Sequence, residues 1–288
     1  MSLRHADPWL RWGSRVAAVG AAGLLLAVGV VVVAGALPGL RAFGPIAFLA
    51  DATWQPSAGR VGALALIAGT AAVTVLALLL ALPLGAAAGI ASGWLLSSRA
   101  AGAVRLCMLV AAGIPSVVLG LWGLTTLAPL LAHWRAPGTS LLAASIVLAL
   151  MLAPTIAVVV DAALRGVAPE QRRAAAALGL SRWGALASAG RGALRGGLLT
   201  AAVISAARAL GETMAVLLVA GNVVQVPGSL LDPVRTLTGG IALEMAYAAG
   251  DHRAALFTLG LIALAVVTTL LLLLRRWTGD DRAGAAHV

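Results

Sequence analysis

Six long apolar segments dominate this sequence and decide which solvent it can fold in. They cover residues 16–37, 61–97, 106–131, 139–160, 197–220 and 254–274. A helix that crosses the apolar core of a bilayer needs about 20 such residues, so each segment is long enough. The sequence therefore predicts an all-α membrane protein with six transmembrane helices. With no repeat and no linker between two compositions, the whole chain, 1–288, is expected to form one domain.

Two segments carry helix-breaking residues. The second is too long for one upright span and has Pro83 near its middle, so we expect a tilted or kinked helix, or two pieces. The third contains Gly113 and Pro115 and is also expected to bend.

A regular spacing of glycines marks one face of the second segment. Gly85, Gly89 and Gly93 recur every four residues, which places them in a strip where a neighbouring backbone can approach closely. With 34 glycines in the chain, chance can produce the same spacing. We assign these three residues to helix–helix contact.

The arginines predict how the chain is oriented. All 20 basic residues are arginines, and with six spans and the N-terminus inside, fourteen of them lie in cytoplasmic segments and only five outside. The positive-inside rule then places both termini in the cytoplasm. The arginines lie between apolar segments and form no basic run interleaved with aromatics, so we expect no nucleic-acid partner despite a net charge of +10.

Missing residue types exclude several functions. The chain has no lysine, and a P-loop needs a lysine on the nucleotide phosphates, so this chain cannot hydrolyse ATP by that motif. Its four histidines lie in terminal or connecting regions, and no His, Cys and carboxylate spacing resembles a metal or nucleophile site. We therefore predict a protein that moves a solute, with no catalytic residue, metal or cofactor.

The fifth segment carries two charges near its middle, Arg208 and Glu212. Two central charges raise the free energy of membrane insertion by roughly 5–7 kcal/mol, about as much as the apolar residues of the segment lower it. Both charged side chains must therefore face the bundle interior or water. Four residues apart on a helix they can form a pair. Between and beside them, Gly211 could admit a helix or ligand and Thr213 could add a hydroxyl. A structural ion pair and a site on the solute path are both open, and intramembrane charge favours the second.

Residues 161–196 form the longest polar stretch and are predicted to be an organised cytoplasmic connection. Pro169 suits the first position of a helix, Gly179 is the expected terminator, and Ser181 can cap a second short helix. This helix–glycine–helix element could dock to a cytoplasmic partner.

Several stretches together resemble a known family. Residues 208–216 read Arg-Ala-Leu-Gly-Glu-Thr-Met-Ala-Val and are followed by Gly221 and Asn222. Further matching stretches are 54–56, 62–63, 69–70, 83–85, 114–118, 120–123, 128–129 and Glu244. This pattern resembles the phosphate ABC-importer permeases of the PstC type, over nearly the whole chain.

The resemblance implies a fold, an activity and partners. The fold would be that of type I ABC-importer permeases, in a bacterial inner or plasma membrane. The activity would be ATP-driven import of inorganic phosphate by alternating access. Arg208 would hydrogen-bond phosphate oxygens, and Glu212 would orient Arg208 or accept a hydrogen bond from a protonated phosphate oxygen. The partners would be a PstA-like second permease, a PstB-like cytoplasmic ATPase dimer and a PstS-like extracytoplasmic phosphate-binding protein.

The resemblance also implies that 161–196 is the loop that couples the permease to its ATPase. Ala174, Ala175 and Gly179 match the expected pattern, whereas Arg173 stands where the family has glutamate. Arg191 and Gly192 stand where it has Leu-Pro, and Glu170, one turn earlier, could replace the missing carboxylate. These departures put the strength or partner choice of coupling in question.

Three alternatives stay open at this point. The solute could be another oxyanion such as sulfate or molybdate. The chain could be an ion-coupled secondary transporter, which would use the same buried charges without an ATPase. A membrane-bound enzyme agrees least with the sequence, because no residue cluster suits catalysis.

Overall fold

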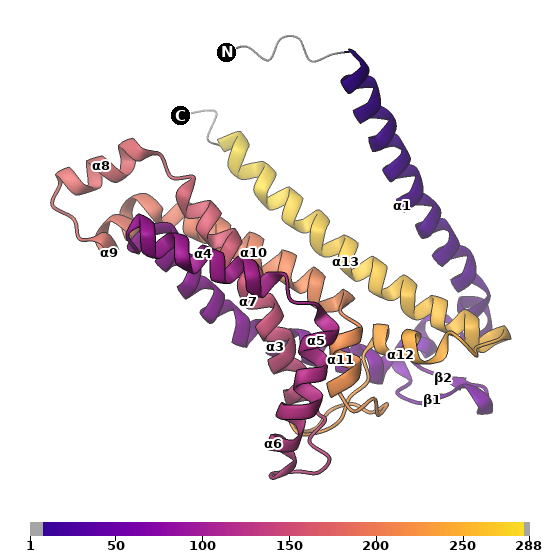
Figure 1. Ribbon diagram of the computed structural model, residues 1–288. Coiled ribbons are helices and arrows are strands. Elements are labelled where there is room, and N and C mark those ends of the chain that lie inside the picture. Colours follow the sequence, from indigo (N-terminus) through magenta and orange to yellow (C-terminus); the bar gives the residue numbers. More distant parts are fainter. Residues whose placement is uncertain (1–7, 285–288) are drawn as a thin grey trace.

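The computed structural model describes residues 8–284 and is almost entirely helical (Figure 1). Its long helices are α1 (Pro8–Phe43), α3 (Leu64–Ile90), α4 (Ser98–Ala112), α7 (Leu141–Arg165), α10 (Arg191–Gly211) and α13 (Gly250–Gly284). Its shorter helices are α2 (Pro45–Ala50), α5 (Ser116–Trp122), α6 (Ala128–Ala132), α8 (Pro169–Ala177), α9 (Arg182–Ala185), α11 (Met214–Val219) and α12 (Leu237–Glu244). The ends of the predicted single domain, residues 1–7 and 285–288, lie outside the described part of the chain.

Short irregular elements join or extend these helices. The strands β1 (Trp54–Gln55) and β2 (Arg60–Val61) pair antiparallel, with the 3₁₀ turn η1 (Pro56–Ala58) between them. Three π-helical turns continue α-helices: η2 (Ala91–Leu95), η3 (Gly123–Leu127) and η4 (Leu186–Gly190). Since π turns leave the regular bonding pattern of the α-helix, they are places where side chains can reach backbone carbonyls.

The predicted number of spans agrees with the structure. Five helical stretches are long and apolar enough to cross a membrane, and a sixth crossing is formed if 98–112 and 116–132 count as one broken span. The two parts of that span meet at 86°, as the glycine and proline between them predicted. Pro83 lies inside α3, which continues through η2 to Leu95, so the alternative of two separate pieces is wrong.

The predicted boundaries of the fifth span and of the connection before it are wrong. The span runs from Arg182 to Gly211 rather than over 197–220, because α9, η4 and α10 are continuous. At the other end of the connection, α7 extends to Arg165. The whole of 161–196 was predicted to lie outside the spans. In the structure only α8 and the loops on either side of it do so.

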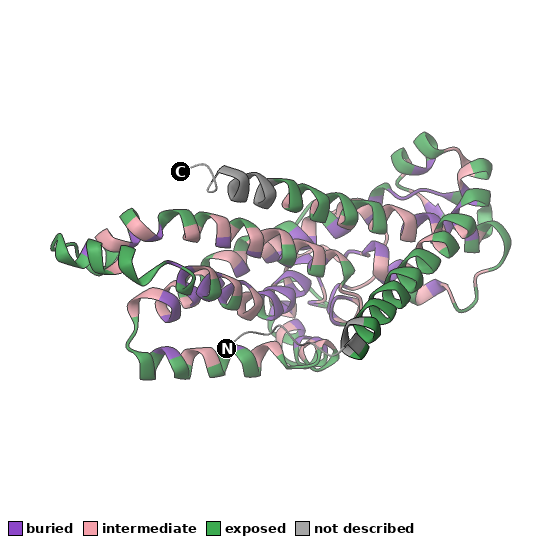
Figure 2. Cartoon of the chain, turned by 90° about the horizontal axis from the view of Figure 1, so that it is seen from above, coloured by how far each residue is buried: buried purple, intermediate pink, exposed green. Residues whose placement is uncertain are grey.

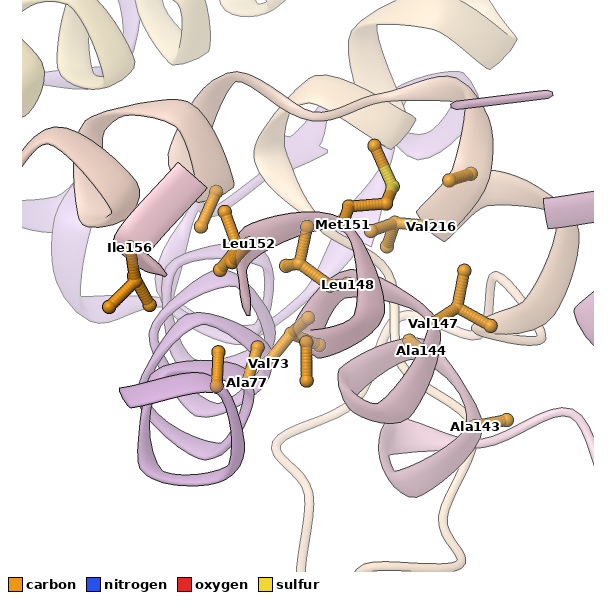
Figure 3. Packing of buried hydrophobic residues seen from close by; sticks show 14 of the residues in the cluster. Val73, Ala77, Ala143, Ala144, Val147, Leu148, Met151, Leu152, Ile156 and Val216 are labelled. Atoms are coloured by element: carbon orange, nitrogen blue, oxygen red, sulfur yellow. The ribbon is translucent and has the colours of Figure 1, made fainter. Parts of the chain in front are cut away.

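Helix α7 is the centre of the bundle. In its most apolar stretch 61% of residues are buried, whereas the corresponding stretch of α1 has none, and Figure 2 shows α1 as largely exposed. Figure 3 shows Leu148 and Leu152 of α7 in one packed cluster with Val73 and Ala77 of α3 and Val216 of α11. Because side chains from three elements fill one cluster, the position of α7 fixes those of its neighbours.

The glycine strip of α3 is the surface that brings α3 and α7 together. A Cβ atom at Gly85 would lie 2.6 Å from the carbonyl oxygen of Ala153, and one at Gly89 would lie 2.7 Å from that of Ala157. At Gly93 it would lie 3.1 Å from Cα of Asp161. The three contacts advance by four residues on both helices, so the two backbones approach each other closely over two turns.

A second, smaller core closes the end of the molecule that carries the β-hairpin. Phe48 of α2, Trp54 and Val61 of the hairpin, and Leu256 and Leu259 of α13 are buried together there. This cluster fixes the hairpin and α12 beside the first turns of α13, far from α8 and α9 (Figure 1).

Substituting Gly89 with alanine should destabilise the protein by about 1–3 kcal/mol, because the added methyl group must displace the backbone of α7. The midpoint of thermal unfolding in detergent measures this. Gly102→Ala in α4 is the matched control: nothing lies within 4 Å of its Cβ position, and helix propensity alone should make it neutral or slightly stabilising. A Gly89→Ala protein as stable as Gly102→Ala would contradict the close approach of α3 and α7.

Candidate functional site

The candidate site lies where the fifth span breaks. Helix α10 ends at Gly211, and Glu212 follows it with extended backbone angles (φ −70, ψ 128) before α11 begins at Met214. A Cβ atom at Gly211 would meet no heavy atom within 4 Å, so space stays open beside the break. The hydroxyl of Thr213 donates to the carbonyl oxygen of Gly211 at 3.2 Å. The predicted single helix over 197–220 is therefore two helices with an irregular turn between them.

Arg208 and Glu212 do not form the predicted pair. Arg208, on an exposed face of α10, donates through Nη1 to the hydroxyl of Thr155 on α7 at 3.0 Å. Oε1 of Glu212 instead accepts a hydrogen bond from the backbone N–H of Ala215 at 3.3 Å. The reason is the break itself, because the two side chains are neighbours only if the helix continues between them.

Two contacts fix the break. The hydroxyl of Thr238, on α12, donates to the carbonyl oxygen of Glu212 at 3.0 Å, which satisfies a backbone acceptor that the end of α10 leaves free. The carboxylate of Glu212 lies at the start of α11, where an acidic group is favourable. The turn is thus held by side chains from within and outside the span.

The other broken span packs beside this one. Helix α5, which follows the 86° bend, lies against α11, and a Cβ atom at Gly120 would lie 2.8 Å from Cα of Ala215. Non-helical backbone at membrane depth is tolerated only where protein or water covers it. Two adjacent breaks therefore indicate a region that is shielded from lipid.

The predicted coupling residues lie on and around α8, which projects from the bundle with α9 (Figure 1). As predicted, Pro169 begins α8, Gly179 follows its end with a positive φ of 71°, and Ser181 caps α9 by accepting from Gly184 N–H at 3.1 Å. Glu170, Arg173 and Ala174 are exposed and Ala175 is buried. Arg191 and Gly192, also exposed, belong to α10 instead of the connection.

Two exposed apolar side chains lie near the tip of this projection. Leu178 is 79% exposed and Trp183 is 63% exposed. Large apolar side chains that stand together on a projecting element mark a contact surface.

A polar cluster that sequence reasoning missed lies at the opposite end of the molecule. The carboxylate of Glu244 is buried. It accepts hydrogen bonds from Trp54 Nε1 at 2.8 Å and Arg235 Nη1 at 2.6 Å, and it lies 2.8 Å from His252 Nε2. These four residues line one side of an open cavity of about 570 Å³. Trp54 and Glu244 both fall in family-like stretches, but nothing in the sequence shows that they meet across 190 positions.

Between residues 8 and 284, no three His, Cys, Asp or Glu side chains gather closely enough to hold a metal ion.

Comparison with known proteins identifies the family. Residues 81–280 match the model of the family described as the binding-protein-dependent transport system inner membrane component. The chain belongs to this family. It is therefore a membrane component of a transport system, a permease rather than an enzyme, and the broken spans belong to a permease fold.

Named relatives resemble the permease over most of their length. It is 36% identical to the probable ABC transporter permease protein YqgH of Bacillus subtilis, over 85% of this chain and 82% of that protein. It is 32% identical to the phosphate transport system permease protein PstC of Mesorhizobium japonicum, over 94% and 90%. It is 31% identical to the PstC protein of Haemophilus influenzae, over 88% and 86%.

Replacing Glu244 with glutamine should lower the stability of the permease by about 1–3 kcal/mol, because Arg235 then loses its charged partner in a largely buried place. Thermal unfolding in detergent measures the change. Asp251→Asn, in the first turn of α13 and exposed, is the matched control and should cost less than about 1 kcal/mol. Equal stabilities of the two variants would show that the Glu244 cluster contributes nothing.

Proposed function

We propose that this permease forms half of the path by which an ATP-driven importer carries inorganic phosphate across the bacterial inner membrane. The observation that carries the proposal is Arg208, an exposed guanidinium on a transmembrane helix, positioned by Thr155 beside a break in the span. The names of the PstC relatives support phosphate as the solute.

The exposure of Arg208 supports a second permease as partner. A charge that faces lipid at mid-depth costs several kcal/mol, so another protein or a water-filled path must cover this face. The nearby short helices also expose apolar side chains: Val117 and Leu121 of α5 and Met214 of α11 are each about half exposed. A related permease, packed on this side, would bury them and enclose Arg208 in a central path.

The chemistry of Arg208 suits an oxyanion. A guanidinium has five N–H donors in a planar fork, and the bond to Thr155 uses only one of them. The remaining donors can bind two oxygens of phosphate in parallel, which is the strongest form of anion recognition by a side chain. Glu212, occupied at the start of α11, holds the break in place and does not contact Arg208.

Energy and solute delivery come from other subunits in this proposal. The projecting α8 and α9 dock to a cytoplasmic ATPase pair, with Glu170, Arg173, Ala174, Ala175, Gly179 and Ser181 near the contact. The end with the hairpin and the Glu244 cavity faces an extracytoplasmic binding protein. The arginine distribution, which favours cytoplasmic termini, supports this orientation.

Arg208→Gln should abolish phosphate uptake in cells that carry the complete transporter, while the complex still assembles, because the amide cannot supply the charged fork. Uptake of radiolabelled phosphate and co-purification of the subunits measure the two properties. Arg195→Gln, an exposed arginine on the same helix, should leave uptake within about twofold of wild type. Full transport by Arg208→Gln would overturn the role of this residue.

Thr155→Val should raise the KM for phosphate while Thr155→Ser restores it, because only serine keeps the hydroxyl that positions Arg208. The loss of one hydrogen bond to a charged group corresponds to a change of roughly tenfold or more. If valine and serine give the same KM, Thr155 does not position the arginine.

Inhibitors and competing anions separate the alternatives. If an ATPase drives import, vanadate should stop uptake and an uncoupler applied at constant ATP should not. Uptake that is stopped by the uncoupler and not by vanadate would indicate an ion-coupled transporter. Unlabelled phosphate should compete with labelled phosphate, whereas sulfate and molybdate should not. Competition by sulfate or molybdate at similar concentrations would assign another oxyanion as the solute.

A further inference from the structure

The end of the second span is held in an unusual way. A helix leaves its last carbonyl oxygens without partners, and its C-terminal end attracts cations. Here three arginines from three other elements supply the missing donors. Arg105 of α4 donates to Ser92 O at 2.8 Å, Arg172 of α8 to Gly93 O at 3.4 Å, and Arg182 of α9 to Leu95 O.

Trp94 makes this contact rigid. The guanidinium of Arg172 lies 4.1 Å from the centre of the Trp94 ring, and the indole N–H of Trp94 donates to the carbonyl oxygen of Arg182 at 3.0 Å. On another side of the ring, a Cβ atom at Gly190 of η4 would lie 3.3 Å from it. The ring thus contacts α8, α9 and η4, which follow one another along the chain.

The same end of α3 is fixed to α7 by a buried carboxylate. Asp161, 2% exposed, accepts from Ser92 Oγ at 2.8 Å, from Arg105 Nε at 3.0 Å and from Arg165 Nε at 2.8 Å. Arg172 also donates to the carbonyl oxygen of Leu164, near the end of α7. Elements that would otherwise end separately in the cytoplasm therefore converge on η2.

One donor in this arrangement is left over. Within the described part of the chain, Nε of Arg172 is buried and has no hydrogen-bond partner, and burial lowers the pKa of this guanidinium. A buried N–H without an acceptor is costly, so a small movement of α8 that supplies one is favourable.

We propose that Trp94, Arg172 and Arg182 form a joint, here called the α3 joint, through which movement of α8 and α9 is passed to the spans α3 and α7. The inference rests on the proposed function, because the force on α8 comes from the ATPase. In this joint the three residues are positioning residues and do not contact the solute. When the α3 joint is weakened, α8 and α9 still move with the ATPase, but α3 and α7 no longer move with them.

The test uses the complete transporter, with both permeases, the ATPase pair and the binding protein, in proteoliposomes. The quantity measured is the number of phosphate ions taken up per ATP hydrolysed. Arg172→Gln removes the charge over the ring, and we expect this ratio to fall roughly tenfold while hydrolysis continues, the size of effect typical for a charged hydrogen bond. Trp94→Phe, which keeps a ring and loses the N–H, should lower the ratio about threefold.

Two further variants sharpen the test. Because both residues act in one joint, the double variant should be no worse than Arg172→Gln alone, whereas independent sites would add their effects. Arg172→Lys keeps the charge over the ring and should fall between wild type and Arg172→Gln. Arg195→Gln, exposed on α10, is the control for loss of a cytoplasmic-side arginine and should keep the wild-type ratio.

A purely structural role gives a different result. Uptake and hydrolysis would then fall together with the amount of assembled complex and leave the ratio unchanged, and this outcome, or failure of the variants to assemble, overturns the α3 joint. Assays with phosphate, sulfate and molybdate keep the proposed function separate. If another oxyanion is transported, phosphate specificity fails, and the ratio measured for that oxyanion still decides the role of the joint.

Discussion

The close approach of α3 and α7 is the contact on which the rest of this permease depends. It exists because Gly85, Gly89 and Gly93 leave no side chains between the two backbones. In a bilayer the lipid chains are as apolar as leucine, so close contact and hydrogen bonds hold helices together instead of the hydrophobic effect. With α3 fixed against it, α7 becomes the central helix, and its polar residues are carried to defined depths. Thr155 reaches Arg208 on the exposed face of α10, and Asp161 reaches Ser92 and Arg105 nearer the end of α7.

Polar groups inside the bundle are satisfied both by ion pairs and by contacts at helix ends. Asp161 and Glu244 are paired with arginines. The carboxylate of Glu212 accepts from the N–H of Ala215 in the first turn of α11, Thr238 bonds the carbonyl oxygen of Glu212, and three arginines bond the carbonyls of η2. The break at Glu212 and the π turn η2 free backbone groups at places where a side chain from another element binds them. This explains how a chain with so many glycines keeps a defined structure around irregular backbone.

The sequence predicts the parts of this structure that depend on local pattern. Apolar length gives the spans, the four-residue glycine spacing gives a close-contact face, and Pro169, Gly179 and Ser181 give the ends of α8 and the start of α9. The predictions that are wrong concern residues whose hydrogen-bond partners a local pattern does not reveal. Arg208 and Glu212 have the spacing of a helical pair, yet the helix breaks between them, and their side chains bond Thr155 and the backbone N–H of Ala215 instead. Asp161 looks like part of a solvated connection, but Arg105 and Ser92 bury it. The meeting of Trp54 and Glu244 has no local signal at all.

The two proposed functional regions are linked by a short piece of rigid helix. Thr155 and Asp161 are separated by six positions on α7, a rise of about 9 Å along the axis. A rotation or tilt of α7 that begins at the α3 joint therefore displaces the hydroxyl that positions Arg208, without any intermediate loop to absorb the movement. In the proposed mechanism, the donors that Arg208 offers to an oxyanion would then change direction when the end of α7 beside the joint moves. Through this one helix, an arrangement that binds the solute from one side can become one that releases it to the other.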